Sequence, residues 1–150
     1  MSLTVTTENG KIIFKGNIDE KCDIGEIFKA LSGDLILNLK GVGSANSVGL
    51  RSWIIELTKY TNKHSVQIEA LPYALAVQAR MVRNLFAKAK VTSTLAPYYC
   101  TACEDEKLIE IQGAQVTGGE VPEAHCPQCK AVLDFDDLPQ FFDFLNRRAG

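Results

Sequence analysis

The chain has 150 residues, of which 46% are hydrophobic and 23% charged, and its formal net charge at pH 7 is -2. This composition is typical of a soluble globular protein with one ordinary domain, or with a domain of about 100 residues and a small appendage. The net charge gives no reason to expect nucleic acid or an anionic membrane as the main partner. No apolar run approaches the roughly 18 residues needed to cross a bilayer, so we expect no membrane insertion.

The N-terminal residues and the cysteine usage indicate a reducing compartment. The first eight residues contain no basic region followed by an apolar core, so we expect no signal peptide and a cytoplasmic location. Thiols stay reduced there. Four of the five cysteines form two tight pairs, which favours a metal site over disulfides.

The first third of the chain predicts a hairpin, a helix and a buried strand. Two β-prone runs at 4–7 and 11–15 flank Asn9-Gly10, the strongest short hairpin signal. Apolar residues at positions 24, 27, 28 and 31 form one helical stripe. The nearly continuous apolar run Leu35–Leu39 is expected of a strand covered on both faces.

Two further strand and helix pairs follow before the cysteines. After a loop over residues 41–46, a second helix turns Leu50, Trp53, Ile54, Leu57 and Thr61 inward, and residues 66–71 alternate like a strand. A third helix is expected over residues 74–87, and a last strand over 90–95 that runs straight on to Cys100. The order ββαβαβαβ predicts an α/β fold with a mixed, mainly parallel sheet whose N-terminal hairpin adds an antiparallel edge.

No linker separates this part from the cysteine region. We therefore divide the chain into residues 1–97 and a small C-terminal module, residues 98–150, that grows directly out of the last strand. The module should end in a short helix, because Leu138, Phe141, Phe142 and Leu145 repeat at helical spacing behind Asp137, a plausible N-cap, and Pro139.

The cysteines have the spacing of a structural metal site. Cys100 and Cys103, then Cys126 and Cys129, form two C-x2-C pairs separated by 22 residues. Two such turns aim four thiolates at one point and complete a tetrahedron, which predicts structural zinc, with iron of the rubredoxin type left open. A strand over residues 108–111 and a turn over 117–120 suit a zinc-ribbon-like hairpin.

Three rival interpretations of the pairs are weaker. A redox C-x-x-C of the thioredoxin type occurs once and begins a helix. A catalytic zinc keeps an open position, whereas four cysteines fill the shell. Acidic residues at 104–106 and 134–137 would repel the phosphates of nucleic acid. His125 is expected to be a bystander, and Cys22 a small packed or exposed thiol.

Residues 1–97 resemble the STAS domain, the fold of bacterial anti-sigma factor antagonists. The resemblance rests on the element order and on the apolar strand Leu35–Leu39, which leads through Gly43 and Ser44 into Asn46-Ser47-Val48-Gly49-Leu50-Arg51. In that family a loop reading roughly Asp-Ser-Ser-Gly-Leu opens the next helix at this place. The cysteine module lies outside the usual domain and looks like an elaboration of it.

The family's phosphoacceptor is missing here. The resemblance implies that a partner kinase phosphorylates the serine before the glycine, but this chain has Val48 there, and Asn46 replaces the aspartate, so a local negative charge is also missing. Ser47 aligns with the other serine and is either a helix N-cap, which we favour, or a phosphoacceptor as well. Gly49 is expected to permit close backbone packing.

No catalytic constellation stands out, so we expect no enzyme activity. The resemblance implies a bacterial signalling or regulatory module that binds an anti-sigma kinase-like or other regulatory protein. The expected surface comprises Ser44, Asn46, Ser47, Val48, Gly49 and Arg51. The alternative is a constitutive STAS-like adaptor subunit of a larger assembly, such as a lipid-transport complex. Homo-oligomer formation stays open.

Overall fold

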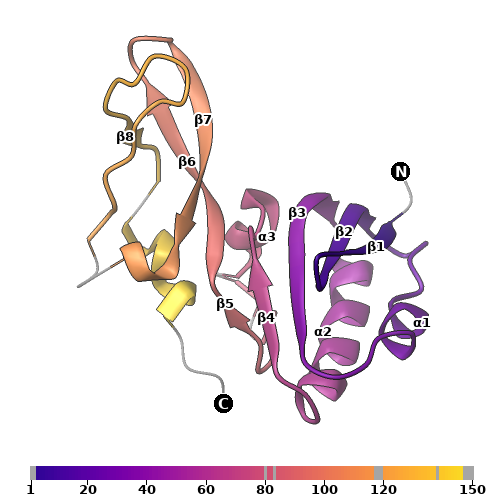
Figure 1. Cartoon of the computed structure of the whole chain (residues 1–150). Helices are drawn as coiled ribbons and strands as arrows, with labels where there is room; N and C mark the ends of the chain where they lie inside the picture. The colour runs from indigo at the N-terminus through magenta and orange to yellow at the C-terminus, as the bar shows by residue number, and fades with distance from the viewer. Residues whose placement is uncertain (1–2, 80, 83, 117–119, 138, 147–150) are drawn as a thin grey trace.

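The computed structural model describes residues 3–79, 81–82, 84–116, 120–137 and 139–146. It confirms an α/β fold with a mixed, mainly parallel sheet (Figure 1). The strands of this sheet lie in the order β1-β2-β3-β4-β5, where β1 is antiparallel to β2 and the other neighbours are parallel. Their bounds are β1 Thr4–Glu8, β2 Lys11–Ile18, β3 Leu35–Ala45, β4 Val66–Glu69 and β5 Lys90–Val91.

The predicted hairpin is confirmed as the pair β1 and β2. Its two turn residues, Asn9 and Gly10, have φ angles of 50° and 78°. Positive φ at both central residues is the requirement of a type I′ turn, whose twist matches that of the flanking strands. Asn-Gly meets that requirement with little strain, because both residue types enter the left-handed region readily.

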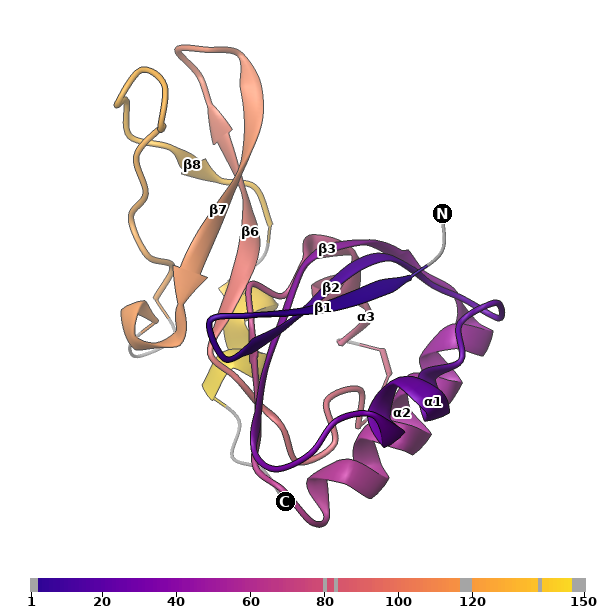
Figure 2. The same cartoon turned by 45° about the vertical axis from the view of Figure 1, so that its right-hand side comes forward.

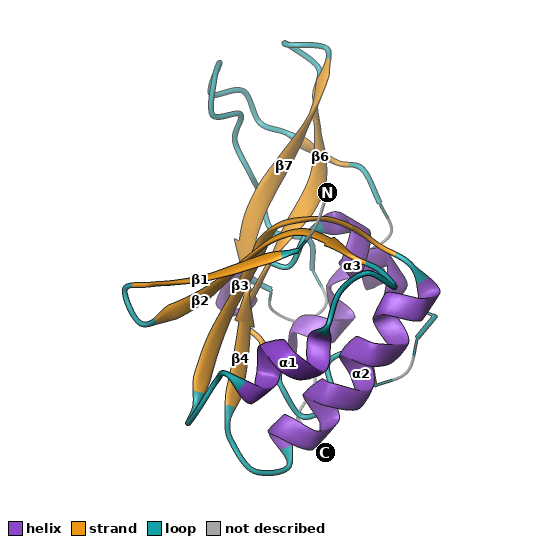
Figure 3. Ribbon diagram, turned by 90° about the vertical axis from the view of Figure 1, so that its right-hand side faces the viewer, coloured by secondary structure: helices purple, strands orange, loops and turns teal. Residues whose placement is uncertain are grey.

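Helices α1 (Ile24–Lys29) and α2 (Ser47–Thr61) lie side by side against the sheet (Figure 3). Trp53 of α2 connects the two helices to the sheet. The centre of its ring lies 5.9 Å from that of Phe14 of β2 and 5.8 Å from that of Phe28 of α1. The indole N–H donates to the carbonyl of Leu85 at 3.0 Å, so this buried polar group is satisfied. Among the described residues, no helix has the length and apolarity needed to cross a membrane.

Strand β3 differs from the prediction in two ways. It was expected to be covered on both faces, but burial alternates along Leu35–Leu39, with Ile36 and Asn38 only half-buried. It also continues to Ala45, through the segment expected to be a loop. The register between β2 and β3 shifts twice along this extension, between Ile13 and Lys15 and between Gly16 and Asn17 of β2.

The third helix is much shorter than predicted. Helix α3 covers only Tyr73–Gln78, and residues 84–88 form turns. Asn84 and Ala87 have φ angles of 62° and 49°, which no right-handed helix can include. The apolar periodicity that suggested one long helix therefore reflects a helix followed by turns that pack against the same core.

A second sheet of three strands, in the order β7-β6-β8, carries the C-terminal part of the chain. Strand β6 (Ser93–Cys100) pairs along its whole length with β7 (Asp105–Gln112) and at Tyr98 and Tyr99 with β8 (Asp134–Phe135). We call this three-stranded sheet the ribbon. Figures 1 and 2 show that β6 and β7 rise away from the five-stranded sheet. Strand β6 runs without a break across residues 97 and 98, where we divided the chain.

The predicted terminal helix is present as a 3-10 helix, η2 (Pro139–Asn146), after the short η1 (Gly113–Gln115). Leu138, the first residue of the predicted stripe, lies outside the described residues. The other three residues of the stripe are buried. Phe141 stacks on Tyr73 of α3 at 5.9 Å, and Phe142 stacks on Phe135 of β8 at 5.1 Å. Helix η2 thus packs against both parts of the molecule.

Gly49 sets the approach of α2 to β2. A Cβ added at this position would lie 2.4 Å from the carbonyl oxygen of Ile18 and 2.6 Å from the backbone nitrogen of Asp19. We expect Gly49→Ala to lower the free energy of unfolding by about 1–3 kcal/mol, because backbone atoms must move to make room. Urea denaturation of the full chain measures the change.

Gly25→Ala is the matched control. A Cβ at Gly25 would lie 3.6 Å from the Glu56 carboxyl group, an ordinary van der Waals distance, and alanine favours a helix over glycine by up to about 1 kcal/mol. The stability of this variant should be unchanged or raised. Equal effects of the two substitutions would contradict a close backbone contact at Gly49.

Candidate metal centre and partner surface

The four paired cysteines meet at the tip of the ribbon. Cys100 ends β6 and Cys103 lies in the turn to β7. Cys126 and Cys129 lie in a second turn, closed by hydrogen bonds from Cys126 N to Ala131 O at 2.8 Å and from Leu133 N to Ala124 O at 2.9 Å. Residues that are more than 20 positions apart are thereby brought to one place.

The two turns have matching backbones. The residue after the second cysteine of each pair, Glu104 or Lys130, has a positive φ angle, 54° and 67° respectively. In the first turn the N–H of Cys103 donates to the sulfur of Cys100 at 3.3 Å. Each turn thus reverses within four residues and directs both of its thiols to the same side.

The sulfur positions fit a tetrahedral metal ion. All four Sγ atoms lie within 4.8 Å of one another, with 3.5 Å between Cys100 and Cys129 and 3.9 Å between Cys103 and Cys126. Four ligands at 2.3 Å from a tetrahedral centre lie about 3.8 Å apart. All five cysteines of the chain are free thiols, so no disulfide competes for these sulfurs.

The pKa values of two of the four thiols, those of Cys126 and Cys103, are shifted in opposite directions. The backbone N–H groups of Cys129 and Gln128 lower the pKa of Cys126 to about 6, because they donate to its thiolate. Hydrogen bonds to Cys129 and Cys100 raise the pKa of Cys103 to about 12. Four thiolates cannot lie this close without a cation, and a bound dication would displace the remaining protons.

Lys107 is a residue of the centre that the sequence interpretation missed. Its ammonium group donates to the side chain of Gln128 at 2.7 Å and lies 3.4 Å from Asp105, so it joins the two turns. Burial disfavours its charge, yet the Asp105 carboxylate and the thiolates hold its pKa above the ordinary value. A lysine here would offset part of the negative charge that four thiolates have around a bound dication.

Tyr98 secures the loop that leads to the second pair. Its hydroxyl donates to the carbonyl of Pro122 at 2.7 Å, and burial raises its pKa to about 12.

His125 is exposed, forms a β-bridge with Val132 and lies outside the sulfur cluster. Cys22 is half-buried, and its thiol donates to the carbonyl of Asn17 at 2.9 Å.

The start of α2 has a different cap from the one we favoured. Asn46, not Ser47, is the N-cap: its side-chain oxygen accepts from Gly49 N at 2.8 Å, and Ser47 is the first helical residue. The Asn46 amide also donates to the carboxylate of Glu20, which lowers the pKa of Glu20. A negative charge is therefore present at this loop, supplied by a residue that the motif does not contain.

The remaining residues of the predicted surface lie around that cap. Ser44 is exposed near the end of β3, and Ser47, Val48 and Arg51 are exposed on the first turns of α2, whereas Gly49 is buried against β2. Val48 leaves 55% of its surface open to solvent.

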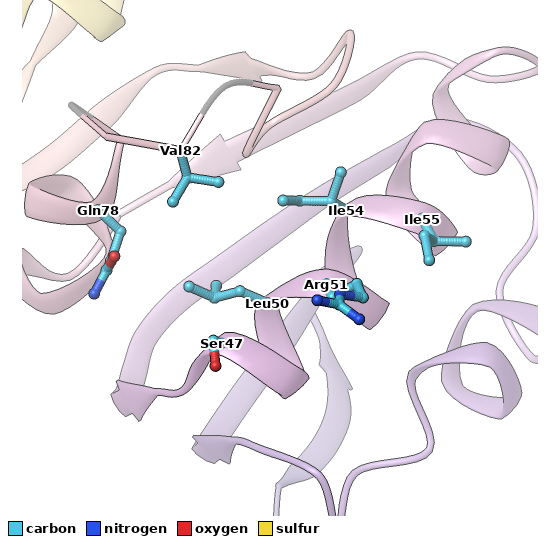
Figure 4. Close-up of a pocket in the computed structure, with 7 residues that line it drawn as sticks. All are labelled: Ser47, Leu50, Arg51, Ile54, Ile55, Gln78 and Val82. Atoms are coloured by element: carbon cyan, nitrogen blue, oxygen red, sulfur yellow. The ribbon is translucent and has the colours of Figure 1, made fainter.

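A groove lies beside this surface, between α2 on one side and Gln78 and Val82 on the other (Figure 4). Its volume is about 400 Å³. Ser47 and Arg51 line it, and the sequence interpretation did not place the other lining residues at a site. They are Leu50, Ile54, Ile55, Gln78 and Val82.

Comparison of the chain with models of protein families, with curated proteins and with solved structures finds no match.

Cobalt provides a direct test of the sulfur site. We expect one equivalent of Co²⁺ per chain to give the absorption of tetrahedral thiolate coordination. Cys129→Ser should weaken binding by more than about a hundredfold, because losing a direct ligand costs more than losing a group that only orients one. Titration followed by visible absorption measures both.

Cys22→Ser is the control for this titration, because Cys22 bonds to Asn17 and not to the cluster. Its Co²⁺ affinity should equal that of the unchanged chain. Equal binding by the Cys129 variant would exclude a site of four thiolates.

Proposed function

We propose that this chain is a non-enzymatic protein-interaction module of the STAS type, acting in bacterial signalling or regulation in a reducing compartment such as the cytoplasm. Its partner would be an anti-sigma kinase-like or other regulatory protein. The element order of the core and the residues at the start of α2 support this proposal.

The observation that carries the proposal is the exposed apolar side chain at the expected regulatory position. Val48 occupies the place of the family's phosphoacceptor, on the first turn of α2, and is 55% exposed. Ile55 lies two turns further along the same helix and is 47% exposed. Large apolar side chains gathered on one exposed helix face favour a partner that covers them.

Loss of the acceptor changes how such binding would be controlled. Valine carries no hydroxyl, so a kinase could not switch binding through position 48. The exposed hydroxyl of Ser47 is one residue away, with Arg51 one helical turn further on. Either binding is constitutive, as in an adaptor subunit, or phosphate on Ser47 controls it in an altered way.

The metal centre would then have a structural role. We propose zinc as the bound ion, since four thiolates favour a soft or borderline dication and fill its coordination shell. A filled shell leaves no position for a substrate or an activated water. The ion would hold the tip of the ribbon in shape, while partner binding takes place at α2.

A pull-down with the full chain from its native cell tests the partner proposal. We expect an identified kinase-like or sigma-pathway protein to be captured by the unchanged chain, and at least about tenfold less of it by Val48→Asp, since a buried unpaired charge costs several kcal/mol. Quantitative mass spectrometry of the captured proteins measures the ratio. Capture of membrane-transport subunits instead would support the adaptor function.

Leu108→Asp is the matched control. Leu108 is 57% exposed, as much as Val48, but lies on β7 of the ribbon. This variant should capture the partner as well as the unchanged chain. Equal loss for both variants, or none for either, would contradict a partner surface at α2.

Metal removal tests the structural role of the ion. With the metal chelated, we expect amide exchange in β7 and around Cys126 to accelerate by at least about a hundredfold, because folding of a thiolate site is coupled to its metal. Amides of β2, β3 and α2 should keep their protection. Hydrogen exchange followed by mass spectrometry separates these segments, and unchanged protection of the ribbon would overturn the structural role.

A further inference from the structure

Among the described residues that line it, the groove beside α2 combines an apolar wall with one cationic side chain, Arg51. Leu50 is buried, Ile54 and Val82 are half-buried, and Leu50 and Ile54 extend from α2 toward Val82 (Figure 4). Ile55 adds a fourth aliphatic side chain. No aromatic ring and no carboxylate belongs to the described residues that line the groove. Such a wall suits an aliphatic chain better than a base, a sugar or a cation.

Arg51 gives the groove a defined charge. Arg51 is exposed, and no hydrogen bond or ion pair joins its side chain to another residue that the structure describes. By contrast, Lys29 of α1 and Lys59 of α2 each form an ion pair with a glutamate three residues earlier on the same helix. An unpaired guanidinium beside an apolar wall is a ready partner for a carboxylate.

Two further groups favour negative charge at the same end. The hydroxyl of Ser47 lines the groove one turn before Arg51. Gln78, from the opposite wall, adds an amide that can donate as well as accept.

We infer that the groove binds a monoanionic aliphatic amphiphile, such as a medium-chain carboxylate. The chain would lie against Leu50, Ile54 and Val82, and the head group would pair with Arg51. The volume of about 400 Å³ is near the lower end of the range of roughly 300–1,000 Å³ for ligand pockets, which favours a medium chain over an entire lipid. The groove is formed by the chain alone, and it shares Ser47 and Arg51 with the proposed partner surface.

Methyl NMR of the full chain, titrated with decanoate below its critical micelle concentration, tests this site. We expect saturable shifts of the Leu50, Ile54 and Val82 methyl signals, with those of Leu108 and Val132 on the ribbon unchanged. Decanol and decyltrimethylammonium carry the same chain without the negative charge. Both should bind at least about tenfold more weakly than decanoate, because a charge-assisted hydrogen bond is lost.

Substitutions assign the head-group contact. Arg51→Gln should weaken decanoate binding about tenfold and leave decanol binding unchanged. Lys59→Gln, an exposed lysine of the same helix outside the groove, should bind decanoate like the unchanged chain. The methyl signals of Leu37 and Leu57, which are fully buried in the core beneath α2, report whether each variant is folded.

Three results would overturn the inference. They are the absence of saturable shifts with decanoate, equal affinities for the three probes, and shifts of exposed methyl groups throughout the chain. If the groove methyls respond to a captured protein but not to decanoate, the groove belongs to the protein interface and not to a small ligand.

Discussion

The five-stranded sheet and the ribbon are held together by the backbone hydrogen bonds of Thr92 and of strand β6, which follows it. The N–H of Thr92 donates to Ile68 of β4 at 2.8 Å, and its carbonyl accepts from Gly113, beyond the end of β7, also at 2.8 Å. One residue thus bonds to the five-stranded sheet with one group and to the ribbon with the other. Strand β6 continues this double role: Leu95 donates to Leu71 at 2.8 Å before the strand reaches the cysteines. Because backbone groups in a buried strand must all be paired, the chain cannot bend freely between the two sheets.

The features that were predicted well from the sequence are those with local causes. Asn9-Gly10 determines its own turn, and the stripe through Trp53 and Leu57 is a property of one helix. The cysteine spacing led to the correct grouping of four thiols, because each C-x2-C turn is a local structure. The end of α3 was predicted wrongly because apolar residues continue at helical spacing beyond it. In the structure those residues form turns that pack against the same core, with Asn84 and Ala87 in the left-handed region.

The residues that the sequence did not predict at the start of α2 and at the cysteine cluster are brought there by tertiary contacts. Glu20 reaches Asn46 across 26 positions, and Lys107 reaches Gln128 across 21. Nothing in the neighbouring sequence marks either residue. Asn46 and Ser47 are both good N-caps, and only the path of the chain from β3 selects Asn46. The cluster of four cysteines lies at the tip of the ribbon, far from α1 and α2 (Figure 1). The two sites can therefore be altered independently.

Helix η2 has a consequence for the order in which the molecule is completed during synthesis. Each aromatic partner that it contacts precedes it in the chain: Tyr73 for Phe141, Phe86 for Phe144 and Phe135 for Phe142. The ribosome releases η2 after all of these, so the corner between the two sheets stays open to water until the ribbon has formed. The N-terminal sheet can form before then, as domains generally do during translation. The aromatic residues of η2 close the core after both sheets have emerged, and a chain that stalls before them would leave the rings of Tyr73, Phe86 and Phe135 without these contacts.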